Sequence, residues 1–137
     1  MKTIYKNLTG NTESSRTSLV LNRQMVEIFR GGESSADVKI TAFSIACTGS
    51  TNFEFDLYLR KVVGFEKKDD TSEHYDRTSD KTIVYGTYYI IKGAVVPTGS
   101  TMFPLENNLI VFDTSFELII CVKGAEAMTA DLILTYE

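Results

Sequence analysis

Short apolar runs separated by turn signals fill residues 85–122, and this spacing constrains the fold more than any other feature of the chain. A parallel crossover needs a dozen or more residues, so runs this close together can only be joined as antiparallel strands. The last run, residues 116–122, is almost wholly apolar, which predicts a central strand buried on both faces. The turn signals are Lys92-Gly93, Pro97-Thr98-Gly99, Asn107-Asn108 and Asp113-Thr114-Ser115.

Two earlier segments alternate as strands do. Residues 53–62 place Phe53, Phe55, Leu57 and Leu59 on one face and polar side chains on the other, which predicts one face on the core and one in water or against a polar partner. Residues 38–47 place Val38, Ile40, Ala42, Ser44 and Ala46 on one face and Lys39, Thr41, Phe43, Ile45 and Cys47 on the other. The remaining predicted strands are residues 82–84, 87–91, 94–96, 101–105, 109–112, 116–122 and 129–136.

The sequence therefore predicts an all-β protein, an antiparallel β-sandwich of jelly-roll type with about eight to ten short strands. Residues 18–137 are expected to form a single sandwich domain, and residues 1–17 a polar N-terminal arm anchored by Ile4, Tyr5 and Leu8. The arm is either a frayed terminus or a segment that becomes ordered on a neighbouring subunit. At the start of the domain, residues 18–21 and 25–29 are predicted as two short strands, with a one-turn helix as the alternative.

Composition excludes several function classes. The formal net charge of −4 argues against sequence-independent binding of nucleic acid and against docking on an anionic membrane. The first residues lack the apolar core of a signal peptide, so we expect synthesis in a cytoplasm. Cys47 and Cys121 are too few for a disulfide framework and are interpreted as buried free thiols, with a disulfide within the chain or between subunits as the alternative.

Residues 64–81 form the one long polar insertion, and a loop of this length in a compact domain usually has a function. Its acidic residues suggest calcium as an alternative to a solvated loop or contact surface, although their spacing is not that of an EF-hand. The candidate interaction residues of this loop are Asp69, Asp70, Glu73, His74, Tyr75, Asp76 and Arg77.

Catalytic patterns are scarce. His74 is the only histidine, so a Ser-His-Asp or Cys-His triad would have a single candidate base, and a zinc site would need carboxylates to complete it. Glu54 and Asp56 lie two residues apart on one strand, which a polar sheet face explains better than glycosidic acid/base chemistry. We therefore expect no enzyme activity, no catalytic residues, no metal and no cofactor. Four tyrosines are candidates for stacking on sugars or bases, with a half-buried sheet face as the alternative: Tyr75, Tyr85, Tyr88 and Tyr89.

The C-terminal half of the chain shows a recurring order of strands and turns. The residues that carry it are Tyr89-Ile90-Ile91-Lys92, Val96-Pro97-Thr98-Gly99-Ser100-Thr101, Leu109-Ile110-Val111, Phe116-Glu117-Leu118-Ile119-Ile120 and Asp131-Leu132-Ile133-Leu134-Thr135-Tyr136-Glu137. This order resembles the C-terminal pattern of small virion proteins of tailed bacteriophages. The segment 38–59 is similar to the part that precedes the pattern in those proteins.

The resemblance implies a structural component of the virion: a capsid decoration protein, or part of the neck, collar or tail. It implies no catalytic residue. The expected partners are other virion structural proteins, with homo-oligomers in a symmetric assembly, and the expected location is the virion after synthesis in the host cytoplasm. The alternative is a lectin-like β-sandwich, with or without a requirement for calcium, that binds a glycan through Tyr75, Asp76 and the acidic loop.

Overall fold

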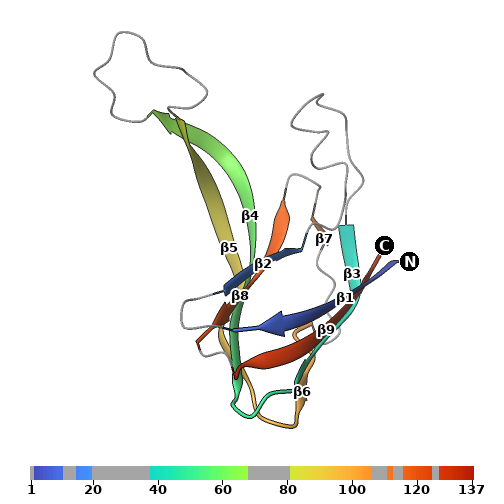
Figure 1. Cartoon of the computed structure of the whole chain (residues 1–137). Coiled ribbons are helices and arrows are strands. Elements are labelled where there is room, and N and C mark those ends of the chain that lie inside the picture. Colours follow the sequence, from blue (N-terminus) through green and yellow to red (C-terminus); the bar gives the residue numbers. More distant parts are fainter. Residues whose placement is uncertain are drawn as a thin grey trace.

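Two antiparallel sheets face each other in the computed structural model of the protein (Figure 1). The structure describes residues 2–10, 15–19, 38–67, 81–105, 111–112, 116–124 and 127–137. These residues contain nine strands and no helix. The predicted all-β antiparallel sandwich is confirmed.

The first sheet has the order β1-β9-β3-β6, with β7 also paired to β3. Both β6 and β7 run antiparallel to β3, one near each of its ends, so together they occupy the position of one interrupted strand. The strands of this sheet are β1 (Lys2–Thr9), β9 (Thr129–Tyr136), β3 (Val38–Cys47), β6 (Thr101–Met102) and β7 (Val111–Phe112).

The second sheet has the order β2-β8-β4-β5. The strands have the order of an eight-position jelly roll, in which the first strand lies beside the last and the second beside the last but one. The strands of this sheet are β2 (Ser15–Leu19), β8 (Glu117–Lys123), β4 (Phe53–Lys67) and β5 (Lys81–Val96).

The core lies between the sheets and is drawn from alternate residues of the central strands. Phe53 and Phe55 of β4 are fully buried, with ring centroids 5.8 Å apart. In β8, Leu118, Ile119 and Ile120 are all fully buried, which confirms the prediction of a central strand covered on both faces. At about 1.5–3 kcal/mol for each large apolar side chain removed from water, these residues provide much of the driving force for folding.

A β-bulge overturns the predicted faces of β3. The pairing of β3 with β9 shifts between Ile40 and Ala42, so that the alternation changes phase. Val38 and Ile40 are buried before the bulge, whereas Phe43 and Ile45 are buried after it. The prediction that residues 38–46 keep one face by strict alternation was therefore wrong, because a bulge adds one residue without changing the composition of the strand.

The Lys92-Gly93 pair is a bulge as well, and not the predicted turn. β5 runs unbroken through residues 81–96, joining the three strands predicted at 82–84, 87–91 and 94–96. Gly93 has a φ of 69°, a left-handed value that glycine adopts without strain in turns and bulges alike. In contrast, the predicted turn at residues 97–99 is confirmed: Ser100 N donates to the Pro97 carbonyl at 3.0 Å.

The predicted N-terminal arm is largely sheet. β1 pairs with β9 of the same chain from Lys2–Tyr136 to Thr9–Thr129, and Leu8 is buried in the core. Residues 15–17 belong to β2, so the boundary predicted at residue 17 falls inside a strand. Polar composition was misleading here, because an edge strand with one solvated face needs few apolar residues.

Three further strand predictions are met only in part. The strand predicted at 18–21 starts at Ser15 and is described to Leu19, and residues 25–29 lie outside the described residues. The strand predicted at 101–105 is limited to Thr101–Met102, and only Val111–Phe112 of residues 109–112 are described as strand.

Cys47 and Cys121 are both free thiols; Cys47 is buried in the core and Cys121 is half-buried.

Candidate functional site

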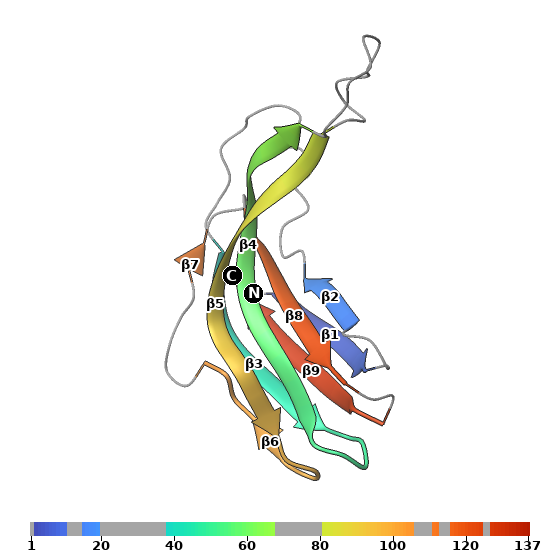
Figure 2. The same ribbon diagram turned by 90° about the vertical axis from the view of Figure 1, so that its left-hand side faces the viewer.

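The far part of the β4–β5 hairpin extends beyond both sheets (Figures 1 and 2). β8 pairs with β4 only as far as Arg60, opposite Glu117. Beyond that point residues 61–67 of β4 pair with residues 81–86 of β5 and with no other described strand. We call residues 61–67 and 81–86 the projecting hairpin. A two-stranded hairpin in water is marginally stable by itself, so an extension of this kind suggests a contact with another molecule.

Exposed apolar side chains gather on the projecting hairpin and on the adjoining residues of β5. Nine large apolar side chains are exposed among the described residues, and five of them lie on β4 and β5 between residues 63 and 89. Exposed apolar groups that cluster, rather than scatter, mark interaction surfaces. We call these five the hairpin surface: Val63 (54% exposed), Ile83 (45%), Tyr85 (39%), Tyr88 (54%) and Tyr89 (52%).

A row of polar contacts across the second sheet holds the ring of Tyr85 in place. The Arg60 guanidinium lies 4.2 Å from the centroid of the Tyr85 ring. The same group donates from Nε and Nη2 to Glu117 Oε2 at 3.2 and 3.0 Å, and Ser18 Oγ donates to that oxygen at 3.1 Å. Because four strands contribute one residue each, these contacts attach the ring to the body of the sheet.

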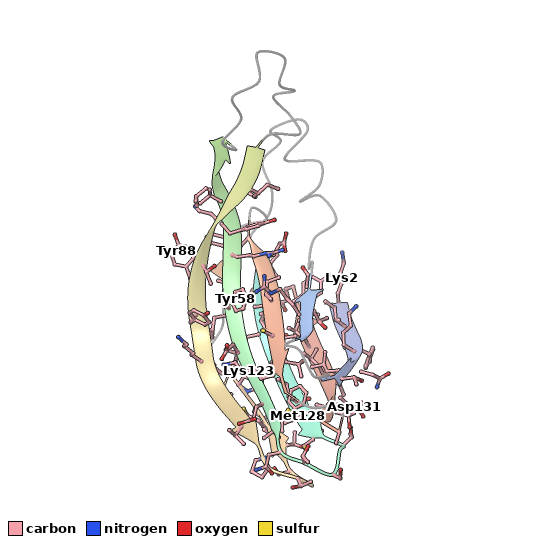
Figure 3. The ribbon with its side chains drawn as sticks, turned by 60° about the vertical axis from the view of Figure 1, so that its left-hand side comes forward. Lys2, Tyr58, Tyr88, Lys123, Met128 and Asp131 are labelled. Carbon is pink, nitrogen blue, oxygen red and sulfur yellow. The ribbon has the colours of Figure 1, made fainter. Side chains whose placement is uncertain are left out.

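A second row holds Tyr89. Its ring packs at 5.4 Å, centroid to centroid, on Tyr58, whose other neighbour is the Arg16 guanidinium at 5.9 Å. Lys92 Nζ lies 5.1 Å from the centroid of Tyr89. Tyr58 is buried on the outer face of the sheet (Figure 3), and burial raises the pKa of its hydroxyl although the Arg16 charge opposes that shift. One face of Tyr89 is thus supported while the residue stays half exposed.

A third row joins the Gly93 bulge to the sheet. Asp56 is buried, accepts a hydrogen bond from Gly93 N at 2.7 Å, and pairs with Lys123 Nζ at 3.0 Å. Burial alone would raise the pKa of Asp56, but the Gly93 hydrogen bond and the Lys123 charge together hold that pKa below its usual value. The polar face predicted for residues 53–62 is therefore buried at Asp56, as it is at Tyr58, and Asp56 is a structural residue.

The core side of the hairpin carries Tyr88. Its ring meets Phe116 edge-on at 6.0 Å, and Lys61 Nζ lies 5.0 Å from the centroid of Phe116. Gly86, the next residue on that side of β5, leaves room for its neighbours: a Cβ there would stand 3.0 Å from Val63 Cγ1. The hairpin surface thus wraps both faces of β5, with Tyr88 on one face and Tyr85 and Tyr89 on the other.

Both carboxylates that take part in these rows, Asp56 and Glu117, are held in ion pairs. Within the described ranges, no group of three or more His, Cys, Asp and Glu side chains is placed to hold a metal ion. Nor do those ranges contain a helix that is long and apolar enough to cross a membrane.

The predicted site residues divide into two groups. Of the arm residues, Ile4 packs partly against the core, Leu8 is buried, and Tyr5 is 72% exposed on β1. Tyr5 lies beside the pair formed by Asn7 Nδ2 and Asp131 Oδ1, which are 2.7 Å apart, and these three residues line a depression between β1 and β9. The loop candidates, Asp69, Asp70, Glu73, His74, Tyr75, Asp76 and Arg77, lie outside the described residues.

Val63 and Ile83 were missed as surface residues by sequence reasoning. Their apolar side chains fit a core strand equally well. Both residues lie on the two-stranded part of the hairpin, beyond the point at which β8 ends opposite Arg60. The available signal was the length of the uncharged run at residues 82–91, which is longer than an ordinary strand.

We compared the chain with protein-family models, with curated proteins and with solved structures, and none of these comparisons finds a match.

Proposed function

We propose that the protein is a non-enzymatic structural component of a bacteriophage virion, which binds neighbouring capsid, neck or tail subunits. The observation that carries the proposal is the hairpin surface, because exposed apolar side chains that cluster where the sheet narrows to two strands mark a site of contact with another molecule. The resemblance of the C-terminal strand pattern to small phage virion proteins supports it. So does the jelly-roll order, which recurs in capsid and lectin domains, although a fold by itself does not define a function.

The proposal also has a physical logic. A virion repeats each contact many times, so a modest interface at each copy is sufficient. The hairpin presents rings that are already held by Arg60 and Tyr58, which lowers the ordering cost of binding. The virion is then the proposed location, following synthesis in the host cytoplasm.

The experiment is to purify phage particles from the source culture by density gradient and to quantify this chain by mass spectrometry. We expect a fixed number of copies per particle that survives repeated banding. Washing with a chelator should not release the chain, since no metal enters the proposed contact. A chain that is absent from particles, or lost at the first wash, would contradict the proposal.

A glycan-binding module is the second candidate, and the depression beside Tyr5 favours it. An exposed aromatic ring next to the hydrogen-bonded Asn7–Asp131 pair offers a stacking face and polar groups of the kind that sugars use. Thermal melts with a panel of sugars, with and without calcium, test this candidate. A ligand-dependent rise in Tm that Tyr5→Ala abolishes would support it, because a ligand that binds only the folded state stabilises that state. Unchanged melts would contradict it.

A further inference from the structure

The free edge of β5 differs from the other sheet edges. β5 is the last strand of its sheet, and none of the described strands pairs with its second edge. Residues 82–91 contain no charged residue and no proline. An edge that is long, apolar and uncharged is a template for pairing with another strand.

The other edges carry the features that prevent such pairing. β1 includes Lys2 and Lys6, β2 has only five residues and includes Arg16, and β6 and β7 have two residues each. The lower part of β5 is protected as well, by the bulges at Ile90 and at Lys92-Gly93. From Lys81 to Tyr89, however, β5 itself has no extra residue; the one bulge in this stretch, at Val63, belongs to β4, on the side of β5 away from its free edge.

We propose that this edge pairs with the same edge of a second copy, antiparallel and around a two-fold axis at Gly86. The proposal rests on the assembly function above and deepens it, since it names the contact by which copies join. The two four-stranded sheets would become one continuous sheet, and each projecting hairpin would gain a third strand. Such an interface is closed and symmetric, which limits it to a dimer.

The occupant is a second copy because the segment is self-complementary. With Gly86 on the axis, Ile83 faces Tyr89 of the second copy and Val84 faces Tyr88, on opposite faces of the combined sheet. Aromatic residues opposite β-branched residues are favourable cross-strand pairs. Gly86 has no side chain to hold the two strands apart at the axis, and in this register Lys81 and Lys92 do not oppose each other.

The test is sedimentation velocity of the purified full chain over a wide concentration range. The wild type should show a reversible monomer–dimer equilibrium. Ile83→Lys should raise the dimer dissociation constant about tenfold or more, because the symmetric interface loses the same pair twice. Tyr89→Glu should weaken it similarly. The double variant Ile83→Lys with Tyr89→Glu should recover most of the loss, since each lysine then faces a glutamate of the other copy.

Ile133→Lys is the matched control. Ile133 is 44% exposed and Ile83 45%, but Ile133 lies on β9, which is paired on both sides. Its substitution should leave the equilibrium unchanged, and thermal melts confirm that each variant is folded. The proposal is overturned by a wild type that stays monomeric throughout, or by a double variant no better than the singles. Copies found in purified particles would still support the virion function in that case, so the two failures are distinguishable.

Discussion

β4 and β5 pair with each other along the whole hairpin, but its two halves have different surroundings. The lower half is residues 53–60 and 87–96, and the upper half is the projecting hairpin. In the lower half β4 lies between β5 and β8, and Phe53, Phe55 and Leu57 are completely buried. In the upper half β5 is the one described strand that lies beside β4, and Val63 and Ile83 are about half exposed. Both halves are rich in apolar and aromatic residues, so the difference lies in what covers them.

The two halves of the hairpin differ in what holds them and in what they present to solvent. Its lower half is fixed by the core on one face and by the Asp56, Tyr58 and Arg60 contacts on the other. Its upper half is joined to these contacts where Tyr85 packs on Arg60, and most of the hairpin surface lies on it. Folding stability should therefore depend on the lower half, and association on the upper half.

The largest expected effect is at the core. Phe55→Ala should lower the free energy of unfolding by about 3–5 kcal/mol, because it leaves a cavity between the sheets where the fully buried ring stood. Urea denaturation measures the change. Val63→Ala in the upper half is the control and should cost about 0.5 kcal/mol or less, as expected of an exposed site. Equal losses at the two positions would break the comparison between the halves.

The next effect is at the bulge. Asp56→Ala removes the acceptor of Gly93 N and the partner of Lys123, and should cost about 1–3 kcal/mol in the same denaturation assay. Asp56→Asn keeps an acceptor oxygen while removing the charge, so it should cost less. If the two substitutions are equally destabilising, the charge and not the hydrogen bond holds the bulge in place.

The same carboxylate gives the lower half a pH dependence. The pKa of Asp56 is lower in the folded chain than its ordinary value of 3.8, so the unfolded state takes up the proton first as pH falls. The stabilisation is complete well above 3.8 and is lost as pH drops through the folded-state pKa. Denaturation midpoints measured across this acid range should fall more steeply for the wild type than for Asp56→Asn. Parallel curves would exclude the contribution of Asp56.

The smallest effect is where the two halves meet. Tyr88→Ala loses an edge-on contact with Phe116 and should cost about 0.5–1.5 kcal/mol. Its effect on association should be larger than its effect on stability, because Tyr88 is 54% exposed and belongs to the hairpin surface. Chemical denaturation and sedimentation velocity on one preparation give both values. A variant that loses stability but associates normally would assign Tyr88 to the fold alone.

The sequence was sufficient for the fold class and for most strands, because alternation and close turn signals leave an antiparallel sandwich as the main solution. It failed where one residue changes the register. The bulge after Ile40 reverses the faces of β3, and Gly93 has the same left-handed φ that a turn would use. Such features depend on the partner strand, which no local pattern contains.

The candidate surface was harder to predict than the fold. Tyr85, Tyr88 and Tyr89 were recognised as stacking candidates, but nothing local distinguishes Ile83 from a core residue. Ile83 lies on the two-stranded part of the hairpin, beyond the point at which the pairing of β8 with β4 ends. The arm prediction failed for the related reason that β1 gains its stability from β9, at the other end of the chain.

Hydrogen–deuterium exchange at low and high protein concentration distinguishes the part of the hairpin that stabilises the fold from the part that associates. Backbone amides of residues 53–59 should be equally protected at both concentrations, because β8 and β5 cover β4 on both sides there. Among residues 82–89, the amides that point away from β4 should gain protection as concentration rises, when the free edge of β5 is paired. Protection of residues 82–89 that does not change with concentration would contradict the division of the hairpin into a folding half and an associating half.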